Sequence, residues 1–410
     1  MNILLIHQSF PGQFKNLLPL LQSLGHKLVA VGARIDTEYR KFLYGQYIYN
    51  PKHGTTVDAF PLTHEVETKA IRGFYAYEGY QKIKQSNFNP DIIIVHPGWG
   101  ESYFLRHVWP DAFIVSFQEF YYQLHNSDLD YDTDYSNNLE LSRLRLEFKN
   151  AHLLHSLNQS NLCLSPTKWQ TSRFPKIYQN KFRTIHEGID LHNLRLVYNQ
   201  ALKSPRFDKR PYVTYMARHL EPYRGYHKLL EIAPRILDEC GKDLQIYIIG
   251  EPQGSGYGSV PQGFKGWKEY FEEKTPLHES YRKRIHYLGT LNYQEYVHVC
   301  SRSLAHFYIS FPFVLSWSVL ELMFMKIPVI ANNISMNSEV IDHYKTGILF
   351  DYNNPIEAVS FLKELIFNPQ LSQNIGQNAK ALISTQFDTQ KTSQLIWNEI
   401  LEAYNKKSLV

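Results

Sequence analysis

Two arginines, Arg218 and Arg224, stand six residues apart in a loop that follows an apolar run. The loop ends at Gly225, directly before a pattern typical of a helix. A guanidinium group keeps its charge at any physiological pH, and it binds phosphate oxygens through two parallel hydrogen bonds. The spacing therefore predicts a clamp for a diphosphate, and solvated loop arginines are the alternative.

A second loop of this character runs from Tyr308 to a helix that begins near Ser316 or Ser318. The N–H groups at a helix N-terminus lack intrahelical partners and bind anions. Glu321, which we place in the first turn, could accept hydrogen bonds from ribose hydroxyls, or could serve only as the capping-box partner of Ser318. The residues of this loop that we predict to contact the phosphates of a donor are Val314, Leu315, Ser316, Trp317 and Ser318.

The loop after the first apolar run, residues 3–6, carries Gly12 directly before a helical pattern. Backbone N–H groups at such a turn favour an anion, so we include Gly12 among the donor contacts. A lone glycine between a strand and a helix is more often structural, and that alternative stays open.

Two further loops in the first half each follow a buried-looking strand, and they contain His96 and Glu119. An imidazole or a carboxylate at a strand end could bind sugar hydroxyls or stabilise positive charge at an anomeric carbon. We therefore predict both as catalytic residues, with a histidine satisfied inside the core as the alternative. The neighbours that we predict to contact the acceptor or the sugar are Trp99, Glu101, Gln118 and Tyr121.

The sequence contains none of the common motifs for metal or covalent catalysis, such as HExxH, GxSxG or a Walker loop. No DxD pair follows a strand end, and the three cysteines are too far apart to suggest a zinc site. We therefore expect neither a metal nor a cofactor. One stretch has an aspartate at every second position. These residues could bind a cation, although a solvated acidic loop is the favoured interpretation. They are Asp128, Asp130, Asp132 and Asp134.

Strand patterns alternate with helical patterns through both halves of the chain, which favours α/β architecture with doubly wound parallel sheets. Two such sheets facing each other would leave a cleft, where ligands bind at the carboxyl ends of the strands. The runs that predict strands are 3–6, 28–31, 91–95, 113–117, 162–165, 183–186, 212–216, 244–250, 304–309 and 327–331.

These patterns divide the chain into two Rossmann-like domains, an N-terminal acceptor domain and a C-terminal nucleotide-sugar donor domain. A polar stretch, residues 199–210, is predicted as the linker between residues 1–198 and residues 211–385. Residues 386–410 are predicted to form a helix that packs back toward the first domain.

Composition excludes several classes of protein for this chain of 410 residues. A net charge of +4 without any long run of Lys or Arg argues against a nucleic-acid partner. No apolar run is long enough to span a membrane, so we expect a cytoplasmic protein. Peripheral contact with the inner face of an anionic membrane is left open by the basic and aromatic residues Arg40, Lys41, Phe42, Tyr44, Arg72, Phe74 and Tyr75.

Taken in order, these motifs resemble those of the family 4 glycosyltransferases, which are retaining enzymes with the two-domain GT-B fold. The resemblance spans the chain and includes the turn 187–190, the loop from Arg218 to Arg224, and the last residue of a Glu-x7-Glu element at Glu321. It implies that Arg218 and Arg224 hold the donor diphosphate and that Glu321 binds the nucleotide ribose.

The chain departs from this family at two places. The first Glu of the Glu-x7-Glu element is replaced by Phe313, and the usual His of the first domain falls near Gln118 and Glu119. The second departure leaves open whether His96, Gln118 or Glu119 takes the first-domain role. A glycine-rich and aromatic segment, residues 254–271, could cover the donor or could be a surface insertion.

We therefore expect a retaining, metal-independent glycosyltransferase. It would move a hexosyl unit from a nucleotide diphosphate sugar to a hydroxyl of a saccharide, glycolipid or protein, in the biosynthesis of a glycan, polysaccharide or glycoconjugate. A nucleotide-sugar epimerase with the same fold is one alternative. A non-catalytic sugar-binding module is the other, because Phe313 replaces a carboxylate.

Overall fold

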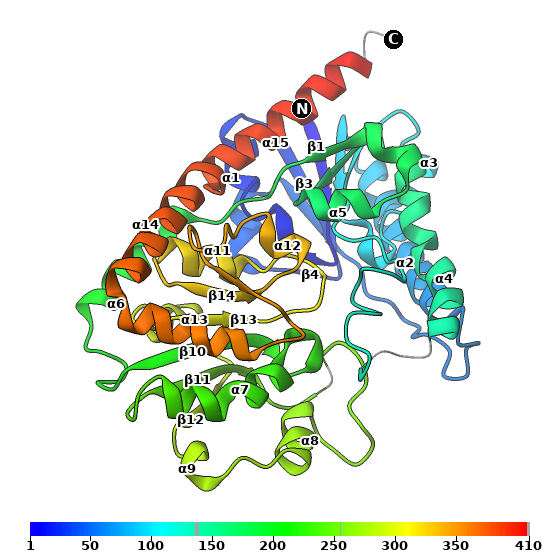
Figure 1. Cartoon of the computed structure of the whole chain (residues 1–410). Helices are drawn as coiled ribbons and strands as arrows, with labels where there is room; N and C mark the ends of the chain where they lie inside the picture. Colours follow the sequence, from blue (N-terminus) through cyan, green and yellow to red (C-terminus); the bar gives the residue numbers. More distant parts are fainter. Residues whose placement is uncertain (136–138, 255, 408–410) are drawn as a thin grey trace. The chain divides into compact units, whose positions relative to one another are not determined.

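The computed structural model describes residues 1–135, 139–254 and 256–407, in which the apolar runs of the sequence form two parallel sheets in two units (Figure 1). The predicted α/β fold class is confirmed. Unit 1 contains Met1–Asp130, Ser136–Gly188 and Thr389–Val410, and unit 2 contains Tyr131–Tyr135 and Ile189–Asp388.

The sheet of unit 1 has seven parallel strands in the order β5-β3-β1-β6-β7-β8-β9. Its inner strands are buried on both faces, as in other parallel sheets that helices cover on both sides. The strands are β1 (Asn2–Ile6), β3 (Lys27–Gly32), β5 (Gly45–Ile48), β6 (Ile92–Val95), β7 (Phe113–Phe117), β8 (Leu162–Ser165) and β9 (Phe182–Thr184). A separate pair consists of β2 (Ser9–Phe10) and β4 (Arg34–Ile35).

Helices connect the strands of this sheet. The α-helices of unit 1 are α1 (Leu18–Ser23), α2 (His64–Gln85), α3 (Leu105–Val108), α4 (Leu139–Gln159), α5 (Lys168–Arg173) and α15 (Thr389–Lys407). The short 3-10 turns are η1 (Gly12–Phe14), η2 (Thr37–Phe42), η3 (Pro97–Trp99) and η4 (Lys176–Lys181). The terminal helix α15 buries Ile396, Trp397 and Ile400 in the core of this unit.

The sheet of unit 2 has six parallel strands in the order β12-β11-β10-β13-β14-β15. The strands are β10 (Tyr212–His219), β11 (Gln245–Glu251), β12 (Ile285–Gly289), β13 (His306–Tyr308), β14 (Val329–Asn332) and β15 (Ile348–Phe350). The helices are α6 (Leu191–Lys203), η5 (Pro222–Arg224), α7 (Tyr226–Glu239), α8 (Trp267–Lys274), α9 (Glu279–Arg282), α10 (Tyr293–Cys300), α11 (Trp317–Phe324), α12 (Ser335–Ser338), α13 (Ile356–Phe367) and α14 (Pro369–Gln386).

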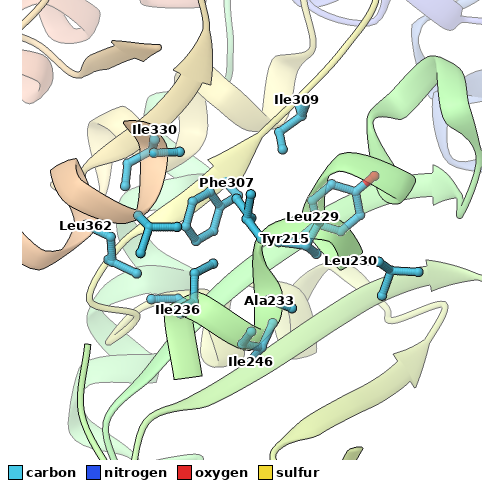
Figure 2. Close-up of a cluster of buried hydrophobic side chains, with 14 of the residues drawn as sticks. Tyr215, Leu229, Leu230, Ala233, Ile236, Ile246, Phe307, Ile309, Ile330 and Leu362 are labelled. Atoms are coloured by element: carbon cyan, nitrogen blue, oxygen red, sulfur yellow. The ribbon is translucent and has the colours of Figure 1, made fainter. Parts of the chain in front are cut away.

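The core of unit 2 forms where α7 lies against the sheet (Figure 2). Leu229, Ala233 and Ile236 recur at helical spacing, so they share the face of α7 that is buried. They belong to the same buried cluster as Tyr215 of β10 and Phe307 of β13. Full burial of each large apolar side chain contributes about 1.5–3 kcal/mol, which holds the loops after these strands on a rigid base.

The predicted linker, residues 199–210, was misplaced. Residues up to Lys203 belong to α6, and the division between the units falls after Gly188. The helix begins after Asp190, whose carboxylate accepts a hydrogen bond from the Asn193 N–H at 2.9 Å. Its polar sequence resembled a linker because only one face of α6 is buried.

Candidate functional site

Each of the two sheets has one place where the strand order reverses. In unit 1, β1 lies between β3 and β6, and in unit 2, β10 lies between β11 and β13. The connections that leave two such neighbouring strands run to opposite sides, which opens a crevice at their carboxyl ends. Within each unit, several of the predicted site residues lie near the carboxyl ends of the strands.

Unit 2 has a cavity of about 540 Å³ at the carboxyl ends of its strands. The cavity brings together Arg218, Arg224, Ser316 and Ser318, four of the residues that the sequence predicts for phosphate binding. The remaining lining residues are Met216, Ala217, His219, Ile249, Gly250, Glu251, Thr290, Leu291 and Tyr308. Three of these residues, His219, Glu251 and Thr290, were not predicted. His219 and Glu251 lie near the ends of predicted strands, which was a usable signal, whereas Thr290 follows β12, a strand that was not predicted.

The backbone around Arg224 is fixed by its surroundings. Tyr215 donates a hydrogen bond from its hydroxyl to the Arg224 carbonyl at 2.5 Å. The next residue, Gly225, has a φ of +68°, and a Cβ at this position would lie 2.2 Å from Cγ2 of Ile309. Glycine is therefore required for the turn that starts α7 and presents Arg224 to the cavity.

A buried carboxyl group lies beside the two arginines. Glu221 is 1% exposed, and it accepts a hydrogen bond from the Tyr257 N–H. Burial raises the pKa of Glu221 to about 7, although the Tyr257 N–H and the charges of Arg224 and Arg218 favour the ionised form. The charge of this carboxyl group therefore changes near neutral pH.

The helix α11 begins at Trp317, and Ser316 is its N-cap residue. The side-chain hydroxyls of Ser316 and Ser318 lie 2.8 Å apart. The predicted first-turn position of Glu321 and its pairing with Ser318 are wrong, because the helix starts earlier than Ser318. Glu321 accepts a hydrogen bond from the Tyr293 hydroxyl at 3.2 Å instead.

The two residues before Ser316 differ in exposure. Leu315 is buried, and Val314 is half-buried. Neither residue is among those that line the cavity.

In unit 1, a chain of hydrogen bonds links β1 to Glu119. His7 Nδ1 accepts from the Ser9 N–H at 3.0 Å, and His7 Nε2 lies 2.8 Å from Gln13 Oε1. The Gln13 amide donates to Glu119 Oε1 at 2.7 Å. His7 and Gln13 were not predicted as site residues, although both lie in the loop after the first strand.

His96 approaches the same carboxylate from β6. Its Nδ1 accepts a hydrogen bond from the Gly98 N–H at 3.2 Å, and its Nε2 lies 3.6 Å from Glu119 Oε2. The His96 ring stacks on Trp99 with ring centroids 4.6 Å apart. The structure therefore brings together the predicted residues His96, Trp99 and Glu119.

The cluster favours an ionised Glu119 beside a neutral His7. Burial opposes ionisation of Glu119, but interactions with His96, Gln13 and His7 outweigh it and lower the pKa of this carboxyl group. Burial, followed by repulsion from His96, lowers the pKa of His7 to about 3. Glu119 is 26% exposed, so it can accept a hydrogen bond from a ligand hydroxyl.

Gly12 lies in unit 1 against the ring of His7. A Cβ at this position would be 2.2 Å from His7 Nε2, so the close approach of the ring explains the glycine. The predicted contact with a donor phosphate is not needed to account for this residue.

Two of the predicted acceptor contacts are wrong, because their side chains are fully buried. Gln118 donates to the hydroxyls of Ser116 at 3.0 Å and Ser156 at 3.2 Å inside unit 1. Glu101 accepts a hydrogen bond from the Tyr49 hydroxyl, and its backbone carbonyl accepts one from Tyr80 at 2.5 Å. A third residue, Tyr121, is half-buried and packs on Phe174.

We predict that Glu101→Gln keeps or increases the stability of the protein at pH 7, whereas Glu101→Ala lowers it by about 2–4 kcal/mol. Burial raises the pKa of Glu101, so its ionisation destabilises the fold as the pH rises, and glutamine removes this cost while retaining an acceptor for Tyr49. Urea unfolding of both variants measures the difference. Equal losses of stability in the two variants would contradict this structural role.

The alternating aspartates do not form a common site. Asp130 accepts hydrogen bonds from the Asn126 and Ser127 N–H groups, whereas Asp132 lies in unit 2. Asp132 is not solvated as predicted, because its carboxylate is 9% exposed and lies 3.1 Å from His227 Nε2 and 2.6 Å from the Tyr352 hydroxyl. Across the described ranges, no group of three His, Cys, Asp or Glu residues could hold a metal ion.

The basic and aromatic residues proposed for membrane contact do not all face solvent. Tyr44 and Phe74 are exposed, but Tyr75 is buried, and Phe42 packs against the core of unit 1. Among the described helices, none combines the length and the apolar character that a membrane span requires.

The segment 254–271 is not merely a surface insertion. Gly254 pairs with Gly266 in an isolated β-bridge, and α8 then buries Trp267 and Phe271 in the core of unit 2. Its glycine-rich part lies beside Glu221, as the Tyr257 N–H bond shows.

Comparison with known proteins identifies both halves of the chain. The family model described as "Glycosyl transferase family 4 group" matches residues 25–194, and that of "Glycosyl transferases group 1" matches residues 198–382. Spore coat protein SA of Bacillus subtilis is 23% identical over 257 residues, which are 58% of this chain and 61% of that protein. Glycosyltransferase 1 domain-containing protein 1 of Xenopus tropicalis is 37% identical over 87 residues, which are 21% of this chain and 25% of that protein. The matched part is thus less than two thirds of the length of each of these curated relatives.

Solved structures share the fold over nearly the whole chain. A sucrose-phosphate synthase from Thermosynechococcus elongatus superposes with a TM-score of 0.72 at 14% identity, covering 99% of this chain and 100% of that one. HepE of Anabaena, solved with UDP-glucose, superposes with a TM-score of 0.66 at 15% identity, covering 98% and 100%. At these identities the likeness is one of fold.

Proposed function

Since the chain belongs to the family 4 and group 1 glycosyltransferases with the GT-B fold, we propose that it transfers a hexosyl unit from a nucleotide diphosphate sugar to an acceptor hydroxyl. The transfer retains the configuration at the anomeric carbon and needs no metal ion. The acceptor is a saccharide, glycolipid or protein, and the product belongs to a glycan, polysaccharide or glycoconjugate.

One observation carries this proposal: Arg218, Arg224 and the N-terminus of α11 line one cavity at the reversal point of the unit 2 sheet. Two permanent positive charges and the N–H groups that begin a helix are complementary to a diphosphate. The remaining wall, formed by the ends of β11 and β12, leaves room for the nucleoside.

The chemistry follows from what leaves the sugar. When the bond between the anomeric carbon and the diphosphate breaks, negative charge accumulates on the departing oxygen, and Arg218 and Arg224 stabilise it. A well-placed donor of this kind contributes about 3–4 kcal/mol to the transition state. Because the guanidinium groups supply this charge, no cation is required, and the leaving phosphate can accept the proton of a hydroxyl that attacks from the same face.

We assign Glu119 and His96 of unit 1 to the acceptor or the sugar. The ionised carboxylate accepts a hydrogen bond from a hydroxyl, and His96 together with the Gln13 amide holds it in place.

Product analysis tests the proposed function. Wild-type protein is incubated with UDP-glucose or the GDP, ADP and TDP sugars, with and without saccharide acceptors and EDTA, and products are identified by NMR. We expect nucleoside diphosphate release and a glycoside of unchanged anomeric configuration that depends on the acceptor but not on the metal. An altered sugar formed without acceptor would indicate an epimerase, and binding without turnover would indicate a sugar-binding module.

The affinity for a nucleotide sugar is expected to fall by up to tenfold between about pH 6 and about pH 8. As Glu221 ionises near its pKa of about 7, its carboxylate repels the diphosphate and weakens the field of the arginines. The diphosphate of a nucleotide sugar keeps the same charge across this range, so the protein is the source of the change. Calorimetric titration of the donor at each pH measures it.

Glu221→Gln is the control, because it removes only the carboxyl group and leaves the residues that line the cavity, such as His219, unchanged. The variant retains an acceptor for the Tyr257 N–H, and its affinity should vary little with pH. The same fall in the variant as in the wild type would refute the role of Glu221.

A further inference from the structure

Next to the arginine pair lies an aromatic group that the diphosphate clamp does not use. Arg224 lies over one face of the Tyr257 ring, with its Cζ 5.5 Å from the ring centroid. Phe313 contacts Tyr257 with ring centroids 5.1 Å apart and planes at 61°. Phe313 stands where the family pattern has the first Glu of the Glu-x7-Glu element, so the chain has replaced a carboxylate by an aromatic pair.

The position of Tyr257 is built into the fold of unit 2. Its N–H donates to the buried carboxyl group of Glu221. The preceding Gly256 has a φ of +61°, and a Cβ there would lie 2.2 Å from Glu221 Oε2, so only glycine permits this approach. A glycine-rich turn anchored on a buried acid therefore holds the tyrosine ring beside Arg224.

Two further aromatic rings, those of Tyr223 and Phe311, connect Tyr257 to the core of unit 2. Tyr223 lies 6.3 Å from Tyr257 and 4.8 Å from Phe311 between ring centroids. Phe311 is buried in the core, whereas Tyr257 is 44% exposed. An exposed aromatic ring on a rigid base is a typical contact surface for a ligand.

We propose that Tyr257 and Phe313 form the subsite for the pyranose ring of the donor and contact its C–H face. This inference rests on the proposed function, because the clamp fixes the diphosphate at Arg224 and the sugar is attached directly beyond it. Aromatic rings pack against the apolar face of a sugar, but they accept hydrogen bonds poorly. This subsite therefore selects the shape of the C–H face rather than individual hydroxyl groups.

Binding measurements on Tyr257→Ala and Phe313→Ala test the subsite. Each protein is titrated with UDP, GDP, ADP and TDP and with the corresponding glucose conjugates, and the ratio of the two Kd values is compared. For the nucleotide that the wild type binds, we expect the affinity for the sugar conjugate to fall about tenfold relative to the diphosphate. Tyr257→Phe, which keeps the ring, should retain the wild-type ratio.

The outcomes separate this inference from the proposed function. If the wild type binds no nucleoside diphosphate, the proposed function and the subsite both fail. If it binds one, and the ratio is unchanged in both alanine variants, the clamp stands and the aromatic subsite is wrong. A third variant, Phe313→Glu, returns a carboxylate to this position and should increase discrimination between glucose and galactose conjugates; unchanged discrimination would contradict the inference.

Discussion

Replacing Arg218 by alanine is expected to lower kcat/KM for the nucleotide sugar by about 10²–10³-fold while the protein stays folded. Arg218 lies at the carboxyl end of β10, it is exposed, and it lines the cavity with Arg224. Its loss removes one of the two charges that stabilise the departing diphosphate. Steady-state kinetics with the preferred donor, together with a thermal unfolding curve, measure both parts of this prediction.

The matched control is Arg210→Ala, which removes the same charge near the amino end of the same strand. Arg210 pairs with Asp208 at 2.8 Å on the surface and does not line the cavity. Activity of this variant should stay within about twofold of the wild type. Near-normal activity of Arg218→Ala, or an equal loss in both variants, would mean that the clamp is wrongly assigned.

Replacing Gly225 by alanine is expected to destabilise unit 2 by about 2–5 kcal/mol and to abolish donor binding. The new Cβ would lie 2.2 Å from Cγ2 and 2.4 Å from Cβ of Ile309, which is 2% exposed and enclosed by the core. Neither atom has room to move, so the turn must shift and take Arg224 with it. Urea unfolding and calorimetric titration of the donor test the two effects.

Gly289→Ala separates the steric clash from backbone strain. Gly289 has a φ of +67°, nearly the same as the +68° of Gly225, but no atom lies within 4 Å of the position that a Cβ would take there. This variant should lose only about 1–2 kcal/mol, the cost of the left-handed conformation itself. If both variants lose the same stability, contact with Ile309 does not explain the glycine.

The sequence predicts the central strands well because they are buried on both faces. The run Ile92–Val95 is continuously apolar, and it forms β6 almost as predicted. The edge strands β5, β12 and β15 were missed. The residues of β5 and β12 are only partly buried, and their apolar runs are broken by Gln46 and His286. The strand β15 (Ile348–Phe350) is mostly buried but has only three residues. A strand that is partly exposed to water contains polar residues, so it lacks the continuous apolar run from which the buried strands were predicted.

The site was predictable where one rule applies, namely that ligands bind at the carboxyl ends of parallel strands. This rule places Arg218 and Arg224 at the cavity of unit 2, and His96 and Glu119 in one cluster of unit 1. The same rule failed for Glu101, which follows β6 but points into the core.

The partners that decide such cases are distant in the sequence. Tyr49 and Tyr80, which hold Glu101, precede it by 52 and 21 residues. Asp132 lies 95 residues before His227 and 220 residues before Tyr352. Spacing along the chain carries no signal for contacts at such sequence distances, so only the fold shows that these carboxyl groups have partners inside the protein.

The central claim is that the cavity with Arg218 and Arg224 holds a nucleoside diphosphate without a metal ion. Calorimetric titration of the wild-type protein with UDP, GDP, ADP and TDP, each with and without EDTA, tests it most directly. We predict that one nucleoside diphosphate binds with a stoichiometry of one, that EDTA leaves its affinity unchanged, and that Arg218→Ala removes the binding. Binding of none of the four, or binding that EDTA abolishes, would contradict the account.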